Sequence, residues 1–290
     1  MKHLGISGGG TKIGGLFSAA EVVLREKNYT PGIISGISAG ALLTVPLAMG
    51  KFDQVRELVL DYSMNDFFSQ RPVTTSGNLS MHALRNFFCG KPFLGRQDNL
   101  PKTIAKVVSA DDFEQYKTSD APVCVVGTVD FISGGRKYFN LKELTYNEYL
   151  LAVNASASIP IFTNAVMLRG YYLFDGGVRD HIATAWMLQH FPEISETVSI
   201  YSRPKDYKVL PSEFSDKNLI KILERYTEIV STEVSKNDEW MEDMICRERN
   251  IRQTKIFLPR MMDSVYDVKR EHLRQIYDAG RQAALDAWEA

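Results

Sequence analysis

The stretch GIISGISAGALLTVPLAMG, residues 32–50, decides the fold that the sequence predicts. Its first residues form an apolar run of strand length, and its last residues are apolar all round, as in a buried helix. Between them, residues 36–40 match the pattern Gly-x-Ser-x-Gly, which can present a serine on a tight turn from strand to helix. The pattern therefore makes Ser38 a candidate nucleophile, with Gly36 and Gly40 as the small neighbours that such a crowded turn needs.

A second stretch, GISGGGTK at residues 5–12, contains the same pattern around Ser7. A run of residues without side chains lets several backbone N–H groups converge on one anion. We expect this stretch to hold an oxyanion, with Lys12 shaping or charging the loop. A glycine-rich turn for helix packing and a phosphate-binding loop are the alternatives, although the P-loop pattern does not occur. The expected amide donors are Gly8, Gly9 and Gly10.

The order of predicted elements favours a parallel sheet flanked by helices. A strand at 2–7, a helix at 15–28 and the strand-turn-helix of 32–50 give the pattern β-loop-α-β-turn-α. Further on, the patterns predict a hairpin at 121–140, a helix at 147–158 and strands at 170–177 and 196–202.

The last third of the chain is charge-rich, and its spacing of apolar residues predicts helices near 215–234, 236–253 and 263–288. No linker of Gly, Ser or Pro precedes it, and the chain has no internal repeat. We therefore expect a single domain over residues 1–290, with an α/β core at 1–200 and a helical C-terminal portion at 212–290 packed on it.

Composition excludes several classes of function. A formal net charge of −1 gives no reason to expect a nucleic-acid partner. The longest apolar stretch is too short to span a bilayer, and the N-terminus lacks the apolar core of a signal peptide. Three widely separated cysteines have no zinc-site or disulfide spacing. We expect a cytoplasmic protein without metal or organic cofactor; non-classical secretion would leave no mark on the sequence, and the oligomeric state is open.

Four motifs together resemble the patatin-like phospholipases: SGGGTKIGG at 7–15, GISAGAL at 36–42, ASASIPIF at 155–162 and DGG at 175–177. The piece VCVVGTVDFISGG also resembles their mid-domain hairpin. The resemblance extends from about residue 3 to residue 180 and implies a three-layer α/β/α fold with a mainly parallel sheet. The chain departs from the family at Lys12, where arginine is common, and at VRDHIA after the DGG, where an Asn and a Pro are often found.

The resemblance also implies a Ser–Asp dyad, in which Asp175 accepts the proton of Ser38 directly and Gly176 and Gly177 allow a close approach. Asp130 stands in the hairpin without an adjacent pair of glycines. A Ser-His-Asp triad would instead need His181, His190 or His272, none of which lies in a recognisable catalytic loop. An acyltransferase of the malonyl-transferase type places histidine before the serine, where this chain has Ile37.

The combined interpretation is a lipid acyl hydrolase of phospholipase A type that uses a Ser38 acyl-enzyme. An acyltransferase with the same dyad and a catalytically silent lipid-binding protein are the alternatives. The substrate would be a lipid, met through peripheral contact with a membrane surface at most. An acyl chain needs an apolar pocket, and two aromatic-rich stretches offer candidates to line or cap it, although plain core is an equal interpretation: Phe67, Phe68, Phe87, Phe88 and Phe93.

Overall fold

The computed structural model describes residues 1–74, 77–206, 219–260 and 270–289 of the chain. A mixed sheet of eight strands runs through it, in the order β5-β6-β3-β2-β1-β7-β8, with β4 paired to β3. Strands β3, β2, β1, β7 and β8 are mutually parallel, while β4, β5 and β6 run antiparallel to their neighbours. The strands are β1 Lys2–Ile6, β2 Ile33–Ile37, β3 Val123–Asp130, β4 Arg136–Asn140, β5 Val166–Leu168, β6 Tyr171–Asp175, β7 Glu196–Tyr201 and β8 Arg252–Phe257.

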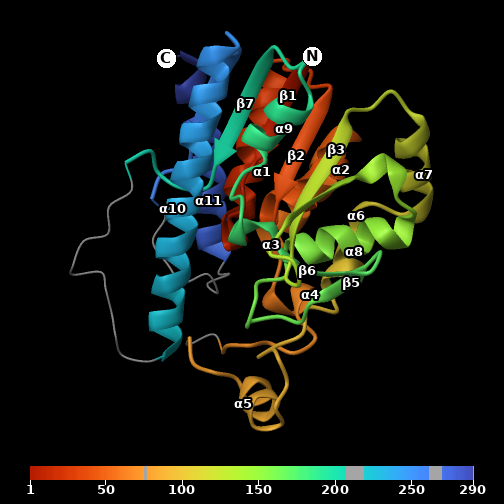
Figure 1. Cartoon of the computed structure of the whole chain (residues 1–290), viewed down its shortest axis with the longest axis vertical. Coiled ribbons are helices and arrows are strands. Elements are labelled where there is room, and N and C mark those ends of the chain that lie inside the picture. Colours follow the sequence, from red (N-terminus) through yellow and green to blue (C-terminus); the bar gives the residue numbers. More distant parts are fainter. Residues whose placement is uncertain (75–76, 207–218, 261–269, 290) are drawn as a thin grey trace.

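Helices cover both faces of the sheet, so the predicted three-layer α/β/α fold with a mainly parallel sheet is confirmed. Helix α10 runs along one side of the molecule, and α5 protrudes at the end opposite to both termini (Figure 1). The helices are α1 Ile13–Glu21, α2 Ala39–Ala48, α3 Phe52–Asp61, α4 Met64–Phe67, α5 Met81–Phe88, α6 Leu100–Val107, α7 Ala110–Thr118, α8 Tyr146–Ser156, α9 Thr184–His190, α10 Leu219–Glu248 and α11 Arg270–Glu289.

The C-terminal third differs from the prediction in two ways. One helix, α10, runs through the region where two helices were expected, because no Gly or Pro interrupts residues 219–248. Residues 252–257 form the edge strand β8 instead of a helix end or loop, because pairing with β7 overrides their local pattern. Parts of the predicted helices, at residues 215–218 and 263–269, lie outside the described residues.

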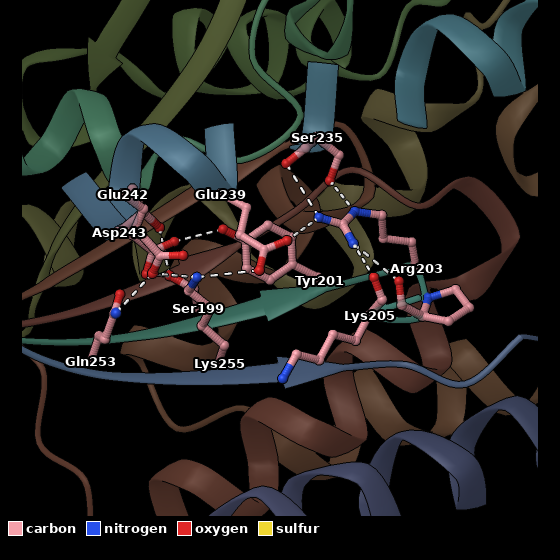
Figure 2. Close-up of polar contacts among 12 residues, drawn as sticks. Ser199, Tyr201, Arg203, Lys205, Ser235, Glu239, Glu242, Asp243, Gln253 and Lys255 are labelled. Atoms are coloured by element: carbon pink, nitrogen blue, oxygen red, sulfur yellow. Dashed lines mark hydrogen bonds and ion pairs between the residues drawn. The ribbon is translucent and has the colours of Figure 1, made fainter. Parts of the chain in front are cut away.

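Both faces of the sheet carry an apolar core, and the face covered by α10 adds a network of polar contacts. Apolar side chains of β1, β2 and β3 on one face pack with α1, α2 and α11 in the main core. On the other face, Ile245 and Cys246 of α10 belong to a second apolar cluster with residues of β2, β3 and α9, and polar contacts also join α10 to β7 and β8 (Figure 2). Glu242 accepts hydrogen bonds from the hydroxyls of Ser199, at 2.9 Å, and Tyr201, at 2.6 Å. Burial raises the pKa of the Glu242 carboxyl to about 7, and these hydrogen bonds partly oppose that rise.

Further ion pairs surround Glu242 and hold α10 on β7 and β8 (Figure 2). Arg203, at the end of β7, pairs with Glu239 and donates to the Ser235 hydroxyl at 2.9 Å. Lys255 of β8 pairs with Asp243 at 2.6 Å. A buried charge is tolerated only when it is paired and hydrogen-bonded, so these partners set the position of α10 on the sheet.

Helix α11 meets α1 at two glycines. A methyl group on Gly280 would lie 2.6 Å from the carbonyl carbon of Gly15, and one on Gly15 would lie 2.9 Å from the carbonyl oxygen of Ile276. Both distances are shorter than van der Waals contact, so only glycine lets the two backbones approach this closely. The C-terminal helix is therefore in direct backbone contact with the helix that follows the glycine loop.

We expect Gly280→Ala to lower the free energy of unfolding by about 1–3 kcal/mol, because the added methyl group forces α11 away from α1. Chemical denaturation followed by circular dichroism measures the change. Asp278→Ala, at an exposed position of the same helix, controls for helix propensity and should be neutral or slightly stabilising. Equal stability of the Gly280→Ala variant and the parent would contradict the close contact.

Candidate active site

Ser38 stands on the turn between β2 and α2, in a backbone conformation that ordinary residues avoid. Its φ of 53° and ψ of −120° hold the residue between the end of the strand and the first turn of the helix. A methyl group on Gly40 would collide with the Ile6 carbonyl of β1, and one on Gly36 with the carbonyl of Gly40. The small residues of the pentapeptide are therefore needed for the turn to fit against the sheet.

Ser156 of α8 supports this turn through two hydrogen bonds. The amide of Ser38 donates to the Ser156 hydroxyl at 2.9 Å, and that hydroxyl donates to the carbonyl of Gly127 in β3 at 2.7 Å. Because the amide hydrogen bond is satisfied, the strained backbone of Ser38 is held in one orientation. Sequence analysis missed this contribution, although Ser156 belongs to the ASASIPIF motif that it had singled out.

The register of β3 brings Asp175 to the same place. Ile37 of β2 lies opposite Gly127, and Asp175 of β6 lies opposite the next residue, Thr128. Strand β4 occupies the other edge of β3 at these positions, so β2 and β6 meet end to end along one edge. Ser38 follows Ile37 directly, so residues far apart in the sequence become neighbours.

The Asp175 carboxylate is buried and faces Ser38. Asp175 is 6% exposed and Ser38 is 9% exposed. Burial raises the pKa of the Asp175 carboxyl to about 6, while the hydroxyl of Ser38 and the amide of Gly177 partly oppose the rise. The Gly177 amide donates to Oδ1 at 2.8 Å, and the Asp175 amide donates to the carbonyl of Ser158 at 2.8 Å. The site thus holds an aspartate of raised basicity beside a serine hydroxyl.

Gly176 has a packing role next to this aspartate. A methyl group at this position would lie 2.6 Å from the carbonyl oxygen of Gly127 in β3. The absence of a side chain therefore lets the chain leave β6 while remaining in contact with β3.

The glycine loop after β1 lies against Ser38, and its three amides differ. A methyl group on Gly8 would lie 3.3 Å from Cβ of Ser38. The Gly8 amide is already used, because it donates to the carbonyl of His181 at 2.9 Å. The amides of Gly9 and Gly10 make no hydrogen bond to any part of the chain that the structure describes. Two of the three expected donors are therefore free to bind an anion.

Lys12 fastens this loop to the end of β7. Its ammonium donates to the carbonyl of Ser202 at 3.0 Å, and burial lowers its pKa, with Glu228 partly opposing that effect. Of the two roles expected for Lys12, this contact fits the shaping of the loop.

Two residues that sequence analysis set aside have structural partners. The Ser7 hydroxyl is fully buried, accepts a hydrogen bond from the Ser202 amide at 2.9 Å and donates to the carbonyl of Gly8 at 3.0 Å. Asp130 closes the turn after β3, where it accepts from the Ser133 hydroxyl at 2.6 Å and from the Tyr172 amide at 3.2 Å. Neither side chain is directed at a substrate position beside Ser38.

His181 is placed differently from the other histidines. Its Nε2 lies 3.6 Å from the position of a Cβ on Gly8, and its buried Nδ1 has no hydrogen-bond partner among the described residues. Burial lowers the pKa of its imidazole to about 3, and the charges of Lys12 and Arg203 add to this effect. The residue is thus a neutral neighbour of the glycine loop. Its amide donates to Asp238 of α10 at 2.6 Å, which fixes the loop after Asp175.

The five aromatic candidates lie in different environments. Phe67 lines a small apolar cavity, Phe68 and Phe93 are half-buried, and Phe87 and Phe88 are 67% and 82% exposed. The cavity lies between α1, α2, α3, α4 and α6. Its wall includes Ile13, just after the glycine loop, and Leu42, one helical turn after Ser38. Phe87 and Phe88 point into solvent, so they neither line this cavity nor belong to the core.

Two features are absent from the described residues, 1–74, 77–206, 219–260 and 270–289. No helix there is both long and apolar enough to cross a membrane. Nor do three or more His, Cys, Asp or Glu side chains within that part of the chain gather where they could hold a metal ion.

A protein family and a solved structure match this chain. The family model described as "Patatin-like phospholipase" matches residues 4–185. Among solved structures, the fold is similar to VipD from Legionella pneumophila, with a TM-score of 0.49 and 13% sequence identity; the match covers 99% of this chain and 66% of that one. No curated protein sequence matches the chain. Because the family model spans more than half of the sequence and includes the glycine loop, Ser38 and Asp175, the chain belongs to the patatin-like phospholipase family.

Proposed function

We propose that this protein hydrolyses fatty-acyl esters of lipids, with Ser38 as nucleophile and Asp175 as general base. Membership of the family supports lipid hydrolase activity in general. The observation that supports the specific dyad is the register of β3, which sets Ile37 and Asp175 opposite consecutive residues. The pKa of about 6 at Asp175 makes its carboxylate a better proton acceptor near neutral pH than a free aspartate.

In the first half-reaction the proton of the Ser38 hydroxyl passes to Asp175 as Oγ bonds to the ester carbonyl carbon. The negative charge that develops on the carbonyl oxygen is stabilised by the amides of Gly9 and Gly10, assisted by the N-terminus of α2. The Gly8 amide is engaged with His181 and fixes the loop instead. The carbon–oxygen bond to the leaving alcohol breaks, and the alcohol takes the proton from Asp175.

In the second half-reaction Asp175 takes a proton from water, and the resulting hydroxide attacks the acyl-enzyme. The tetrahedral intermediate collapses, the bond to Ser38 breaks, and the serine recovers its proton from Asp175. These reaction steps need no histidine, in keeping with the low basicity of the buried His181.

The apolar cavity beside α2 is the proposed entry to the acyl-chain site; its volume is about 30 Å³, so the lining side chains must move apart to admit a chain. It begins one helical turn from Ser38, at Leu42, and reaches α6 through residues such as Val59 and Ile104. A hydrocarbon chain gains free energy for each methylene group that it buries, so an apolar wall at this place favours a fatty-acyl substrate.

The dyad is tested by three variants with a soluble chromogenic ester. Ser38→Ala and Asp175→Asn should each lower kcat/KM by at least about a thousandfold, because each removes a group that takes part in bond formation. Ser7→Ala should keep nearly full activity. Loss of activity in a folded Ser7→Ala protein, together with probe labelling of Ser7 in the parent, would invert the assignment. A fluorophosphonate probe that labelled any residue but Ser38 would likewise contradict the mechanism.

The pH dependence follows from the raised pKa of Asp175. Below about pH 6 the carboxyl is protonated and cannot accept a proton, so kcat/KM should fall about tenfold per pH unit there. A profile that stays flat down to pH 4 would contradict the assignment of the base.

A stability control accompanies this profile. The carboxyl is easier to ionise in the unfolded chain than in the folded one, so its contribution to stability falls as the pH rises from about 4 to about 6. Asp175→Asn should therefore be at least as stable as the parent at pH 8. This outcome separates loss of the base from loss of the fold.

The acyl site is tested by filling the cavity. Leu42→Trp should lower kcat/KM for long-chain esters about tenfold relative to short-chain esters, because the indole occupies the space of several methylene groups. Leu151→Trp, at an exposed position of α8, is the control and should leave the ratio unchanged. An unchanged chain-length preference in a folded Leu42→Trp protein would place the acyl chain elsewhere.

A further inference from the structure

Helix α5 exposes its largest apolar side chains, while Ala83 and Asn86 are its buried residues. Its large apolar side chains point outward: Met81 is 80% exposed, Phe87 67% and Phe88 82%. Its polar Asn86 points inward, where the amide group donates to Gln70 Oε1 and to the carbonyl of Leu94, both at 3.1 Å. Three large apolar side chains together on one protruding helix are unusual for a surface that meets only water.

The charge around α5 is of one sign. Between Asp66 and Asp98 the sequence contains no Asp or Glu, although the whole chain has a formal charge of −1. Arg85 and Lys91 flank the two exposed phenylalanines; both are exposed, and neither forms an ion pair with the described part of the chain. The exposed apolar group is therefore flanked along the chain by two cations that have no ion-pair partner among the described residues.

The position of α5 relates it to the site at Ser38. The segment after the helix is joined to the ASASIPIF motif, since the Leu94 amide donates to the carbonyl of Ile161 at 2.8 Å. The end of the molecule at which α5 protrudes lies opposite to both termini (Figure 1). Two further exposed apolar residues are Ile161, 55% exposed at that hydrogen bond, and Ile132, 78% exposed in the turn after the C-terminal end of β3.

We propose that the segment 81–91 is the surface through which the protein docks on an anionic lipid surface, with Phe87, Phe88 and Met81 entering the headgroup region. This inference rests on the proposed function, because a lipid substrate must leave its bilayer to reach Ser38. Aromatic and apolar side chains ringed by Lys and Arg are the composition that binds at a membrane interface. Docking in this way would present the active-site end of the sheet to the bilayer.

The test measures binding of the full chain to vesicles of phosphatidylcholine with and without phosphatidylglycerol. The parent should bind the anionic vesicles more tightly. Phe87→Ser with Phe88→Ser should weaken binding at least about tenfold.

Arg85→Gln with Lys91→Gln should weaken binding to anionic vesicles about thirtyfold, at about 1 kcal/mol per charge, and leave binding to neutral vesicles unaffected. Trp240→Ser, with a side chain 62% exposed on α10, is the matched control and should bind like the parent.

Cys89 provides a direct probe of insertion. It is the exposed one of the three cysteines, since Cys124 and Cys246 are buried, so an environment-sensitive fluorophore can be attached at the end of α5. The emission should shift to shorter wavelength when anionic vesicles are added. No shift, or unchanged binding by the double phenylalanine variant, would overturn the proposal. A change of oligomeric state in that variant would show instead that the surface binds a second copy.

Hydrolysis of a water-soluble short-chain ester separates this inference from the proposed function. The phenylalanine variant should hydrolyse that ester like the parent, while its turnover of vesicle lipid falls together with its binding. A parent protein that hydrolyses the soluble ester but does not bind vesicles would overturn the docking surface alone. A parent that binds vesicles through α5 but hydrolyses no ester would overturn the proposed function alone.

Discussion

The rest of the site depends on one constraint, the pairing of β3 with two strands along the same edge. Strand β2 approaches in parallel and ends at Ile37 opposite Gly127, and β6 approaches antiparallel and ends at Asp175 opposite Thr128. The hydrogen-bond ladder of a sheet fixes such positions closely. The turn after β2, which carries Ser38, and the turn after β6, which begins at Asp175, are thereby placed next to each other. The Ser156 hydroxyl ties the same Gly127 carbonyl to the Ser38 amide, so strand register and turn geometry support each other.

The C-terminal third contributes to this arrangement through α10. Its polar contacts with β7 and β8 hold the helix on one face of the sheet, and from there Asp238 reaches the loop after Asp175. The two amides of His181 and Ile182 donate to one oxygen of Asp238, at 2.6 and 3.2 Å. Burial raises the pKa of that carboxyl to about 7, with Asp180 adding to the rise. The position of His181, and through its carbonyl that of Gly8, thus depends on a helix distant in sequence.

The aromatic residues show how one kind of side chain is divided between two environments. Phe67 is drawn into the apolar space beside α2, where burial of its ring is favourable. Phe87 and Phe88 remain outside because Asn86 takes the inward position of α5 and is held there by two hydrogen bonds. With Ala83 and Asn86 on the buried side of this short helix, its two phenylalanines lie on the exposed side. The result is a cavity near Ser38 and a separate apolar surface at the end of the molecule.

The sequence by itself determined the α/β class, the strand-turn-helix around Ser38 and the hairpin at β3 and β4, because these follow from local patterns of apolar residues and glycines. It also predicted different roles for the two Gly-x-Ser-x-Gly stretches, and only in the second does the helix begin directly after the serine. Strand β8, the single helix α10, the support of Ser38 by Ser156 and the exposure of Phe87 were decided only by the tertiary structure. Each of these depends on contacts between segments far apart in the chain, and whether an amide is free or a ring is buried is settled only when those segments meet.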